Sequence, residues 1–463
     1  MSQAEAANYA VSRNPATGEI FARYPFDNSA EVELALARSM SGFSQWRRVP
    51  LAERARVLNQ LAGALRNRMG EMSSMISLEM GKPIAQARAE IEKCASLCAW
   101  YAEHGPAFLA PQSTLVDRGQ ARQEFHPLGP VLAVMPWNFP VWQVLRGAAG
   151  IILAGNSYVL KHAPNVMGSA YLLRDAIAAT DLPAGVFEVV NVTPARVSTI
   201  IADSRIAAVA VTGSVRAGSA IAQQAGAALK KCILELGGSD PFIVLADADL
   251  DAAVEAAVVG RFQNSGQVCL AAKRIIVEEA VATRFEARFV SAVKALKVGD
   301  PLSEETYVGP MARYDLRDEL HGQVQATVNE GARLVLGGEK IEGAGNFYPP
   351  TILADVKPNM TSFREELFGP VASLIIARDA EHAVELANDS EFGLGATIWS
   401  ADVGRANKMA ARLETGGVFI NGYVTSDPRL TVGGVKKSGF GRELSSFGLY
   451  EFSNIQTVWV DRR

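Results

Sequence analysis

Apolar residues recur at helical spacing over the first hundred positions of the chain. Leu58, Leu61 and Leu65 follow one another at intervals of three and four, which aligns them on one face of a helix. The same kind of spacing predicts a second long helix through residues 84–101. We therefore expect residues 28–101 to be mainly helical, with their apolar faces packed against the rest of the protein.

Beyond Pro130 the pattern changes to short apolar runs that alternate with alanine-rich helical stretches. Five such runs follow in order: Val131–Met135, Tyr158–Lys161, Val186–Val190, Ala207–Val211 and Cys232–Leu236. Largely apolar runs of this length are typical of parallel strands that helices cover on both faces. The alternation resumes with a strand at Pro241–Leu245, a helix at about 249–262 and a strand at Arg274–Glu278. This predicts a second α/β domain, with a hinge near Gly237 and Gly238.

The segment Ser453–Val460 is predicted to be a β-strand that leaves the body of the protein. A terminal strand of this kind often pairs with a partner subunit, because its edge presents unpaired backbone groups. We therefore expect a homo-oligomer.

Composition and charge exclude several classes of protein. The chain has 463 residues, of which 49% are hydrophobic and 20% charged, as expected for a globular protein of roughly two to three domains. The formal net charge of −4 provides no basic field for nucleic acid or an anionic membrane. No apolar run reaches the ~18 residues of a membrane span, and the first residues carry no apolar core for export. We expect a cytoplasmic protein that binds neither nucleic acid nor membrane.

Of the four cysteines, one is a candidate nucleophile and three are expected to pack in the core. They form no Cys-x-x-Cys pair, and the five histidines fit no zinc spacing, so we expect no metal site and a reducing compartment. Cys269 follows a glycine-containing turn in Gly266-Gln-Val-Cys, whereas Cys94, Cys98 and Cys232 lie in apolar helical or strand patterns. A free cysteine is commonly a small buried hydrophobe, so Cys269 alone does not establish a nucleophile.

Glu235 and Asn138 are candidates to act with a reactive thiol. Glu235 lies between Cys-Ile-Leu and Leu-Gly-Gly, where a half-buried carboxyl would have a raised pKa suited to taking a proton. Asn138 lies in Pro136-Trp-Asn-Phe-Pro140, where two prolines stiffen the backbone. Its amide could donate to an oxyanion, or its side chain could be the N-cap of the next helix.

Two further features suit a dinucleotide. Thr212-Gly-Ser214 follows an apolar run and opens an alanine-rich helix, so backbone N–H groups and Ser214 could receive a phosphate. The segment is not the usual Gly-x-Gly-x-x-Gly, and an ordinary strand-to-helix turn is the alternative. Lys161, at the end of its run, could donate to ribose hydroxyls or be a solvated strand end.

In their order and spacing these motifs, together with Glu365-Glu-Leu-Phe-Gly-Pro370, resemble the aldehyde dehydrogenase superfamily. The resemblance extends from Asn14-Pro-Ala-Thr-Gly-Glu to Glu443 and covers nearly the whole chain. It implies an α/β fold with a Rossmann-type cofactor domain, an α/β catalytic domain and a small β oligomerisation arm. The implied boundaries are 1–108 and 128–236 for the cofactor domain, 237–434 for the catalytic domain, and 109–127 and 450–463 for the arm.

The resemblance also implies catalytic roles. Cys269 would attack the aldehyde carbon, while Asn138 and the backbone N–H of Cys269 hold the developing oxyanion. Glu235 would deprotonate the water that hydrolyses the resulting thioester. Relatives that pass the acyl group to coenzyme A generally lack this glutamate, so we expect a free acid as the product.

For the cofactor, the resemblance assigns Lys161 to the adenine ribose, Ser214 to the pyrophosphate and Glu366 to the nicotinamide ribose. It places five further residues at the cofactor cleft: Trp137, Pro164, Gly213, Leu236 and Phe368. Many NAD-preferring relatives read Lys-Pro-Ala-Glu where this chain has Lys161-His-Ala-Pro164, so the acid that would hold the ribose 2′-hydroxyl is missing. No basic residue beside Lys161 clearly invites a 2′-phosphate. We expect NAD to be preferred, with NADP accepted less well.

An aldehyde that carries a carboxylate is the expected substrate. Arg146 follows Asn138 by a little over two turns of a predicted helix and would project toward the substrate entrance. Succinate semialdehyde dehydrogenases carry an arginine at the matching position, and Ser426 lies in the loop where they have a serine that touches the carboxylate. A surface or interdomain ion pair is the alternative for Arg146.

The match to that branch is incomplete. The branch often has a second arginine shortly before the nucleophile, where this chain has Gln263, and Arg429 in the late loop is a candidate substitute. Trp142, Phe262 and Tyr423 are candidates for the wall of the substrate tunnel, although aromatic residues in such positions are also ordinary core.

We therefore predict oxidation of succinate semialdehyde to succinate with NAD, by a homodimer or homotetramer. The nearest alternative is a dehydrogenase of glutarate semialdehyde or of general uncharged aldehydes. A noncatalytic relative that retains the fold is the alternative from another class, and the intact Cys269, Glu235 and Asn138 argue against it.

Overall fold

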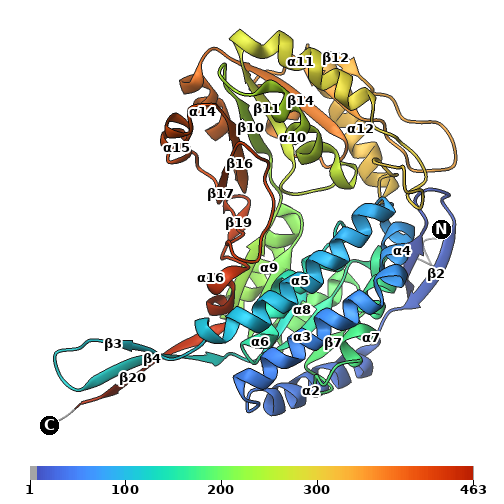
Figure 1. The fold of residues 1–463 in the computed structure, drawn as a ribbon. Helices are drawn as coiled ribbons and strands as arrows, with labels where there is room; N and C mark the ends of the chain where they lie inside the picture. Colours follow the sequence, from blue (N-terminus) through green and yellow to red (C-terminus); the bar gives the residue numbers. More distant parts are fainter. Residues whose placement is uncertain (1–7, 462–463) are drawn as a thin grey trace.

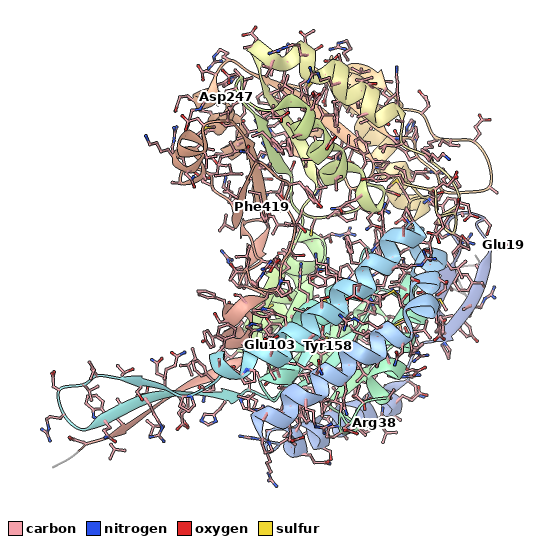
Figure 2. The ribbon with its side chains drawn as sticks, viewed as in Figure 1. Glu19, Arg38, Glu103, Tyr158, Asp247 and Phe419 are labelled. Atoms are coloured by element: carbon pink, nitrogen blue, oxygen red, sulfur yellow. The ribbon has the colours of Figure 1, made fainter. Side chains whose placement is uncertain are left out.

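The computed structural model describes residues 8–461, which form two lobes and a projecting arm (Figure 1). Each lobe is built around one large sheet, and we name the lobes by their sheets: the six-stranded lobe and the seven-stranded lobe. Figure 2 shows Tyr158 and Glu103 in the six-stranded lobe and Asp247 in the seven-stranded lobe.

A hairpin and four helices open the six-stranded lobe. The hairpin pairs β1 (Tyr9–Arg13) with β2 (Ile20–Pro25). The helices are α2 (Ser29–Trp46), α3 (Leu51–Asn67), α4 (Met69–Met80) and α5 (Ile84–Phe108). Leu58, Leu61 and Leu65 are all buried, which confirms the helix face predicted from their spacing.

The six-stranded sheet has the order β19-β9-β8-β5-β6-β7. Its strands are β5 (Pro130–Val134), β6 (Ser157–Lys161), β7 (Phe187–Val189), β8 (Ala208–Thr212), β9 (Lys231–Glu235) and β19 (Gly439–Phe440). The pairs among the first five are parallel, and these strands match the five predicted runs to within one residue at each end. The antiparallel β19, from near the end of the chain, was not predicted because a two-residue strand leaves no periodic pattern.

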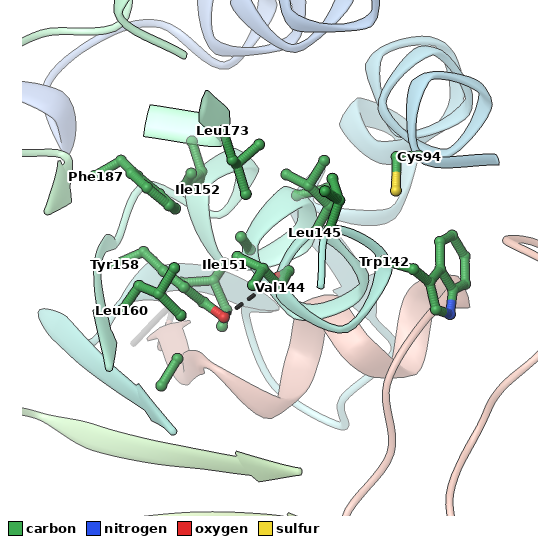
Figure 3. Packing of buried hydrophobic residues seen from close by; sticks show 14 of the residues in the cluster. Cys94, Trp142, Val144, Leu145, Ile151, Ile152, Tyr158, Leu160, Leu173 and Phe187 are labelled. Atoms are coloured by element: carbon green, nitrogen blue, oxygen red, sulfur yellow. Dashed lines mark hydrogen bonds between the residues drawn. The ribbon is translucent and has the colours of Figure 1, made fainter. Parts of the chain in front are cut away.

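Helices cover both faces of this sheet, which explains why its strands are almost continuously apolar. Alternate strand residues pack in two separate cores, one with α2, α8 (Pro194–Ala202) and α9 (Val215–Ala227), the other with α6 (Trp142–Leu153) and α7 (Met167–Ala178). Figure 3 shows the second core, in which the Tyr158 hydroxyl donates to the carbonyl oxygen of Val144 at 3.3 Å. A short 3-10 turn, Pro164–Val166, precedes α7.

The seven-stranded sheet has the order β12-β13-β14-β11-β10-β16-β17. Its strands are β10 (Asp240–Val244), β11 (Ala272–Glu278), β12 (Arg333–Leu336), β13 (Thr351–Ala354), β14 (Val371–Ala377), β16 (Gly395–Trp399) and β17 (Gly417–Ile420). Its helices are α10 (Leu250–Phe262), α11 (Glu279–Lys294), α12 (Tyr314–Asn329), α13 (Thr361–Arg364), α14 (Ala380–Asn388) and α15 (Val403–Ala410). The strands and helix predicted between residues 241 and 278 are confirmed, and Gly237 and Gly238 lie between β9 and β10, which belong to different sheets.

The arm is a three-stranded antiparallel sheet of order β20-β4-β3 that extends away from both lobes (Figure 1). It consists of β3 (Gln112–Thr114), β4 (Gln120–Pro127) and β20 (Ser453–Val460), and β20 confirms the predicted terminal strand. A short helix, α16 (Ser445–Glu451), leads into β20, so the predicted arm boundary at residue 450 falls inside that helix. A small pair, β15 (Phe392–Gly393) with β18 (Val435–Lys436), completes the strands.

None of the helices within residues 8–461 is long and apolar enough to cross a membrane.

Candidate active site

The nucleophile loop lies between α10 and β11. A short 3-10 turn, Gln263–Gly266, follows α10, and its residues Asn264, Ser265 and Gly266 have positive φ angles of 54°, 54° and 70°. A Cβ atom on Gly266 would lie 2.3 Å from the carbonyl oxygen of Gly369, so this position requires glycine. The turn brings Cys269 to a partly exposed position, whereas Cys94 and Cys98 are buried.

Asn138 is joined to this loop through both its side chain and its backbone. Its Nδ2 donates to the carbonyl oxygen of Gln267 at 3.0 Å, and Asn264 Nδ2 donates to the carbonyl oxygen of Asn138 at 2.8 Å. An amide carries two N–H bonds, so the second remains available for an oxygen near Cys269. The N-cap of α6 is Val141, so the alternative role of Asn138 as a helix N-cap is wrong.

The late start of α6 also corrects a geometric expectation. The helix begins only at Trp142, so Asn138 and Arg146 do not lie on one helix as predicted. Pro140 lacks an N–H group, and the backbone N–H groups of Val141 and Trp142 donate to Glu90 instead, each at 2.9 Å.

Glu235 ends β9 as a buried carboxyl next to a buried cation. Its Oε2 lies 3.7 Å from Arg146 Nη2, and its Oε1 has no hydrogen-bond partner within residues 8–461. Burial raises the pKa of Glu235, Arg146 lowers it, and the negative charge of Glu443 raises it. A carboxyl held in this way is suited to accept a proton near neutral pH.

Arg146 does not have the free guanidinium that its predicted role requires. It is buried, forms an ion pair with Glu443 through Nε, and donates from Nη2 to Thr212 Oγ1 at 3.3 Å. With Glu235 on its other side, its charge is already balanced by two carboxyls. The structure therefore favours an ion pair over the carboxylate clamp, although this pair is buried and does not lie at the surface.

Lys273 is a site residue that the sequence analysis missed. Its Nζ donates to the carbonyl oxygens of Cys269 and Val268 at 2.7 Å and 2.9 Å, and lies 3.0 Å from Glu366 Oε1. Burial raises the pKa of the Cys269 thiol to about 11, while Arg146 and Lys273 lower it. The thiol is therefore protonated at neutral pH and needs a base when it reacts. A lysine opening an apolar strand resembles a solvated strand end, so the sequence held no signal for this contact.

The aromatic and acidic residues predicted near the nicotinamide lie close to this loop. Trp137 and Phe368 pack edge to face, with ring centroids 5.8 Å apart, and the ammonium of Lys273 lies 5.9 Å from the Phe368 ring centroid. Glu366 accepts from the backbone N–H of Gly238 at 3.1 Å. These contacts connect the residues predicted to shape the cofactor cleft with the nucleophile loop.

The residues predicted for the other end of the dinucleotide follow β6 and β8. Lys161 is buried at the end of β6, where burial lowers its pKa to about 8, and it forms no ion pair within the described residues. Ser214 is exposed and is the N-cap of α9. Gly213 is half-buried and Pro164 exposed. A buried unpaired cation and an accessible helix N-terminus fit a ribose and a pyrophosphate, so the residues present suit the implied cofactor.

The residues predicted for the substrate divide into two groups. Ser426 and Trp142 both contact Lys93, the former as a hydrogen-bond acceptor at 2.7 Å and the latter through its ring at 4.3 Å. Phe262 is fully buried against Phe289 in the core of the seven-stranded lobe, so its predicted place in the tunnel wall is wrong.

Arg429, predicted to substitute for the missing second arginine, is also not placed for that role. Its side chain is 73% exposed and forms two hydrogen bonds to Asp427, at 2.8 Å and 2.7 Å. Its charge is turned to solvent and already paired.

Leu236, predicted to lie at the cofactor cleft, is buried and follows Glu235 directly. Residues 8–461 contain no cluster of three metal-ligating side chains.

Comparison with known proteins finds relatives over nearly the whole chain. Residues 2–458 match the model of the aldehyde dehydrogenase family. The chain is 63% identical to the succinate semialdehyde dehydrogenase [NAD(P)+] Sad of Escherichia coli, over 98% of this chain and 99% of that protein. It is 44% identical to a probable succinate-semialdehyde dehydrogenase [NADP(+)] of Synechocystis, over 96% of this chain and 98% of that protein.

Solved structures share the fold. The succinic semialdehyde dehydrogenase of Streptococcus pyogenes, solved in complex with NADP+, superposes with a TM-score of 0.96 at 36% identity, covering 98% of this chain and all of that one. A Sinorhizobium meliloti NAD-dependent aldehyde dehydrogenase gives a TM-score of 0.95 at 36% identity, covering 98% of this chain and 92% of that one.

Proposed function

The chain belongs to the aldehyde dehydrogenase family, and from that premise we propose that it oxidises succinate semialdehyde to succinate with NAD, and less well with NADP. The names of its relatives support the substrate, since two proteins that match almost end to end are named a succinate semialdehyde dehydrogenase and a probable succinate-semialdehyde dehydrogenase. The observation that carries the proposal is that Asn138 contacts the loop of Cys269, while the charges of Glu235 and of the neighbouring Arg146 act on the Cys269 thiol.

The reaction begins at the thiol. Cys269 Sγ forms a bond to the aldehyde carbon, and the thiol proton passes to water. The carbonyl oxygen becomes an oxyanion that accepts hydrogen bonds from Asn138 Nδ2 and the backbone N–H of Cys269. Lys273 restrains the loop by donating to the carbonyl oxygen of Val268, which shares a peptide plane with that N–H and so keeps it oriented.

A nicotinamide dinucleotide, when bound, would accept the hydride that leaves the former aldehyde carbon as its oxyanion reforms the carbonyl, which leaves an acyl group on Cys269 Sγ. Lys161, Ser214, Gly213, Leu236 and Pro164 would surround its adenosine and phosphates. Trp137, Glu366 and Phe368 would surround its nicotinamide half.

Hydrolysis completes the reaction. Glu235 takes a proton from a water, whose oxygen attacks the acyl carbon bound to Cys269 Sγ. The carbon–sulfur bond breaks, the leaving thiolate takes the proton held by Glu235, and the acid leaves. The neighbouring cation Arg146 stabilises the ionised form of Glu235 that this step requires.

The substrate is tested by comparing NADH formation with succinate semialdehyde, glutarate semialdehyde and butanal as kcat/KM. We expect succinate semialdehyde to exceed butanal by at least roughly tenfold, about 1.4 kcal/mol in the transition state. Equal or better use of butanal would show a general aldehyde dehydrogenase instead.

The cofactor preference is a separate proposal. Pro164 replaces the acid that commonly excludes a 2′-phosphate, yet no positive charge replaces it, so we expect NAD to be used more efficiently while NADP still reacts. The measurement is kcat/KM for each cofactor at saturating aldehyde. Comparable values, or a higher value with NADP, would contradict the preference.

A further inference from the structure

Lys93 is a half-buried cation held by uncharged groups. It lies on α5, its Nζ donates to Ser426 Oγ at 2.7 Å, and it lies 4.3 Å from the centre of the Trp142 ring. Both contacts orient the ammonium, but neither neutralises it. Within residues 8–461 no carboxylate forms an ion pair with Lys93, which is uncommon for a lysine taken this far out of water.

The position of Lys93 relative to the reacting groups follows from α6. Trp142 and Arg146 are four residues apart on this helix, so they share one face at neighbouring turns. Arg146 contacts Glu235, the proposed base, and Trp142 contacts Lys93. The ammonium of Lys93 therefore lies about one turn of α6 from Arg146. Figure 3 shows Trp142 leaving α6 on the side opposite Tyr158.

The charges around Lys93 leave its ammonium able to bind an anion. Arg146 is balanced by Glu443 and Glu235. Asp427, whose charge acts on Lys93, is itself engaged by Arg429. Burial lowers the pKa of Lys93 to about 8, so most of it is charged at pH 7, and a carboxylate arriving at the ammonium would relieve part of its desolvation.

The negative charge of Glu90 also acts on Lys93. Glu90 forms a buried ion pair with Lys82, however, so it does not neutralise Lys93.

We propose that Lys93 binds the carboxylate of the substrate, beside the Ser426 that the resemblance already placed there, and thereby selects aldehydes with a negatively charged end. The ammonium supplies a charge-assisted hydrogen bond, and the Ser426 hydroxyl, which accepts from Lys93, donates its own proton to a carboxylate oxygen. The indole of Trp142 covers the methylene chain beside them. This inference rests on the proposed function, because it assigns the carboxylate recognition that succinate semialdehyde requires, and it gives to Lys93 the role first expected of Arg146.

The test compares Lys93→Met with Lys93→Arg, using succinate semialdehyde and butanal as substrates. Charge-assisted hydrogen bonds of this kind correspond to roughly 10- to 100-fold in kcat/KM, so Lys93→Met should lose that much with succinate semialdehyde and less than about threefold with butanal. Lys93→Arg keeps the charge and should retain most of the selectivity. Lys294→Met, which removes an exposed lysine on α11, is the matched control and should change neither substrate.

A second measurement reports on binding without turnover of the charged substrate. Succinate is tested as an inhibitor of butanal oxidation, and Lys93→Met should weaken that inhibition by a similar factor while butanal kinetics stay near those of the unmodified enzyme. Thermal unfolding of each variant separates lost recognition from lost folding.

The outcomes distinguish this inference from the proposed function. If the unmodified enzyme does not favour succinate semialdehyde over butanal, the proposed function fails and the inference with it. If the preference exists and survives in Lys93→Met, the inference alone is overturned. An equal loss with both aldehydes would assign Lys93 a structural role and would also overturn it.

Discussion

At the scale of single residues, the ionisation of Glu235 is set by opposing neighbours. Burial has the largest effect and raises its pKa, Arg146 opposes that rise, and Glu443 adds to it. Deacylation requires the ionised carboxylate, so its rate should rise with pH through the raised pKa of Glu235.

Substitution of the two neighbours should move this pH dependence in opposite directions. Arg146→Gln removes a cation, raises the pKa of Glu235 further, and shifts the acidic limb of the kcat profile to higher pH. Glu443→Gln removes an anion, lowers that pKa, and shifts the limb to lower pH. The measurement is kcat against pH under conditions in which hydrolysis limits the rate, with thermal unfolding as the control for folding. Shifts in the same direction, or none, would contradict the assigned electrostatics.

The sequence allowed the reacting residues to be named but not their charge balance. Cys269, Glu235 and Asn138 lie in recognisable motifs, and the structure brings Asn138 and the Cys269 loop into contact. Whether the charge of Arg146 is free depends on Glu443, far away in the chain, and no local pattern indicates that pairing. The contact of Lys93 with Ser426 was missed for the same reason.

At the scale of elements, the start of α6 depends on a buried ion pair. Glu90 accepts from the backbone N–H groups of Val141 and Trp142 and pairs with Lys82, whose ammonium lies 3.7 Å from the Phe139 ring centre. Carboxylates are favoured at a helix N-terminus, where backbone N–H groups lack partners within the helix. The pair therefore fixes the segment that carries Asn138.

Loss of charge at Glu90 should destabilise the protein and slow its reaction. Glu90→Gln leaves Lys82 buried without a counterion, which we expect to lower the free energy of unfolding by roughly 3 to 5 kcal/mol. Displacement of the Asn138 segment should also lower kcat. The control is Glu92→Gln on the same helix, which removes an exposed pair with Arg66 and should cost about 1 kcal/mol or less. Denaturant unfolding measures the free energy of unfolding of both variants, and an equal decrease in the two would contradict the role assigned to Glu90.

The strands were predictable because parallel strands buried on both faces are almost continuously apolar. The start of α6 was not, because Pro140 and the contact with Glu90 delay the helix, and Glu90 belongs to another element. Strand β19 was not predicted because two residues are too few to show a periodic pattern.

At the scale of the whole molecule, the arm presents apolar side chains to solvent. Ile455, Trp459 and Val460 on β20 are 49%, 58% and 53% exposed, although β20 is a strand in a sheet. We propose that a second copy of the chain covers this surface, as expected for a homodimer or homotetramer.

Charge on the arm should therefore dissociate the oligomer. Ile455→Asp combined with Val460→Asp should shift the mass measured by light scattering toward the monomer, because two carboxylates would have to be buried without partners. Leu229→Asp changes a 94% exposed apolar residue on the body and should leave the mass unchanged. A monomeric unmodified protein, or an unchanged mass in the arm variant, would contradict the proposal.

The central claim is that Cys269 carries the acyl group that Glu235 releases, and intact-protein mass spectrometry of Glu235→Gln after mixing with succinate semialdehyde and NAD tests it most directly. The account predicts that one succinyl group accumulates on the protein and that peptide mapping locates it at Cys269. Within the Glu235→Gln protein, Cys269→Ala should abolish the adduct and Cys232→Ala should leave it unchanged. Absence of the adduct in a folded Glu235→Gln protein, its location at another cysteine, or steady turnover at the rate of the unmodified enzyme would contradict the account.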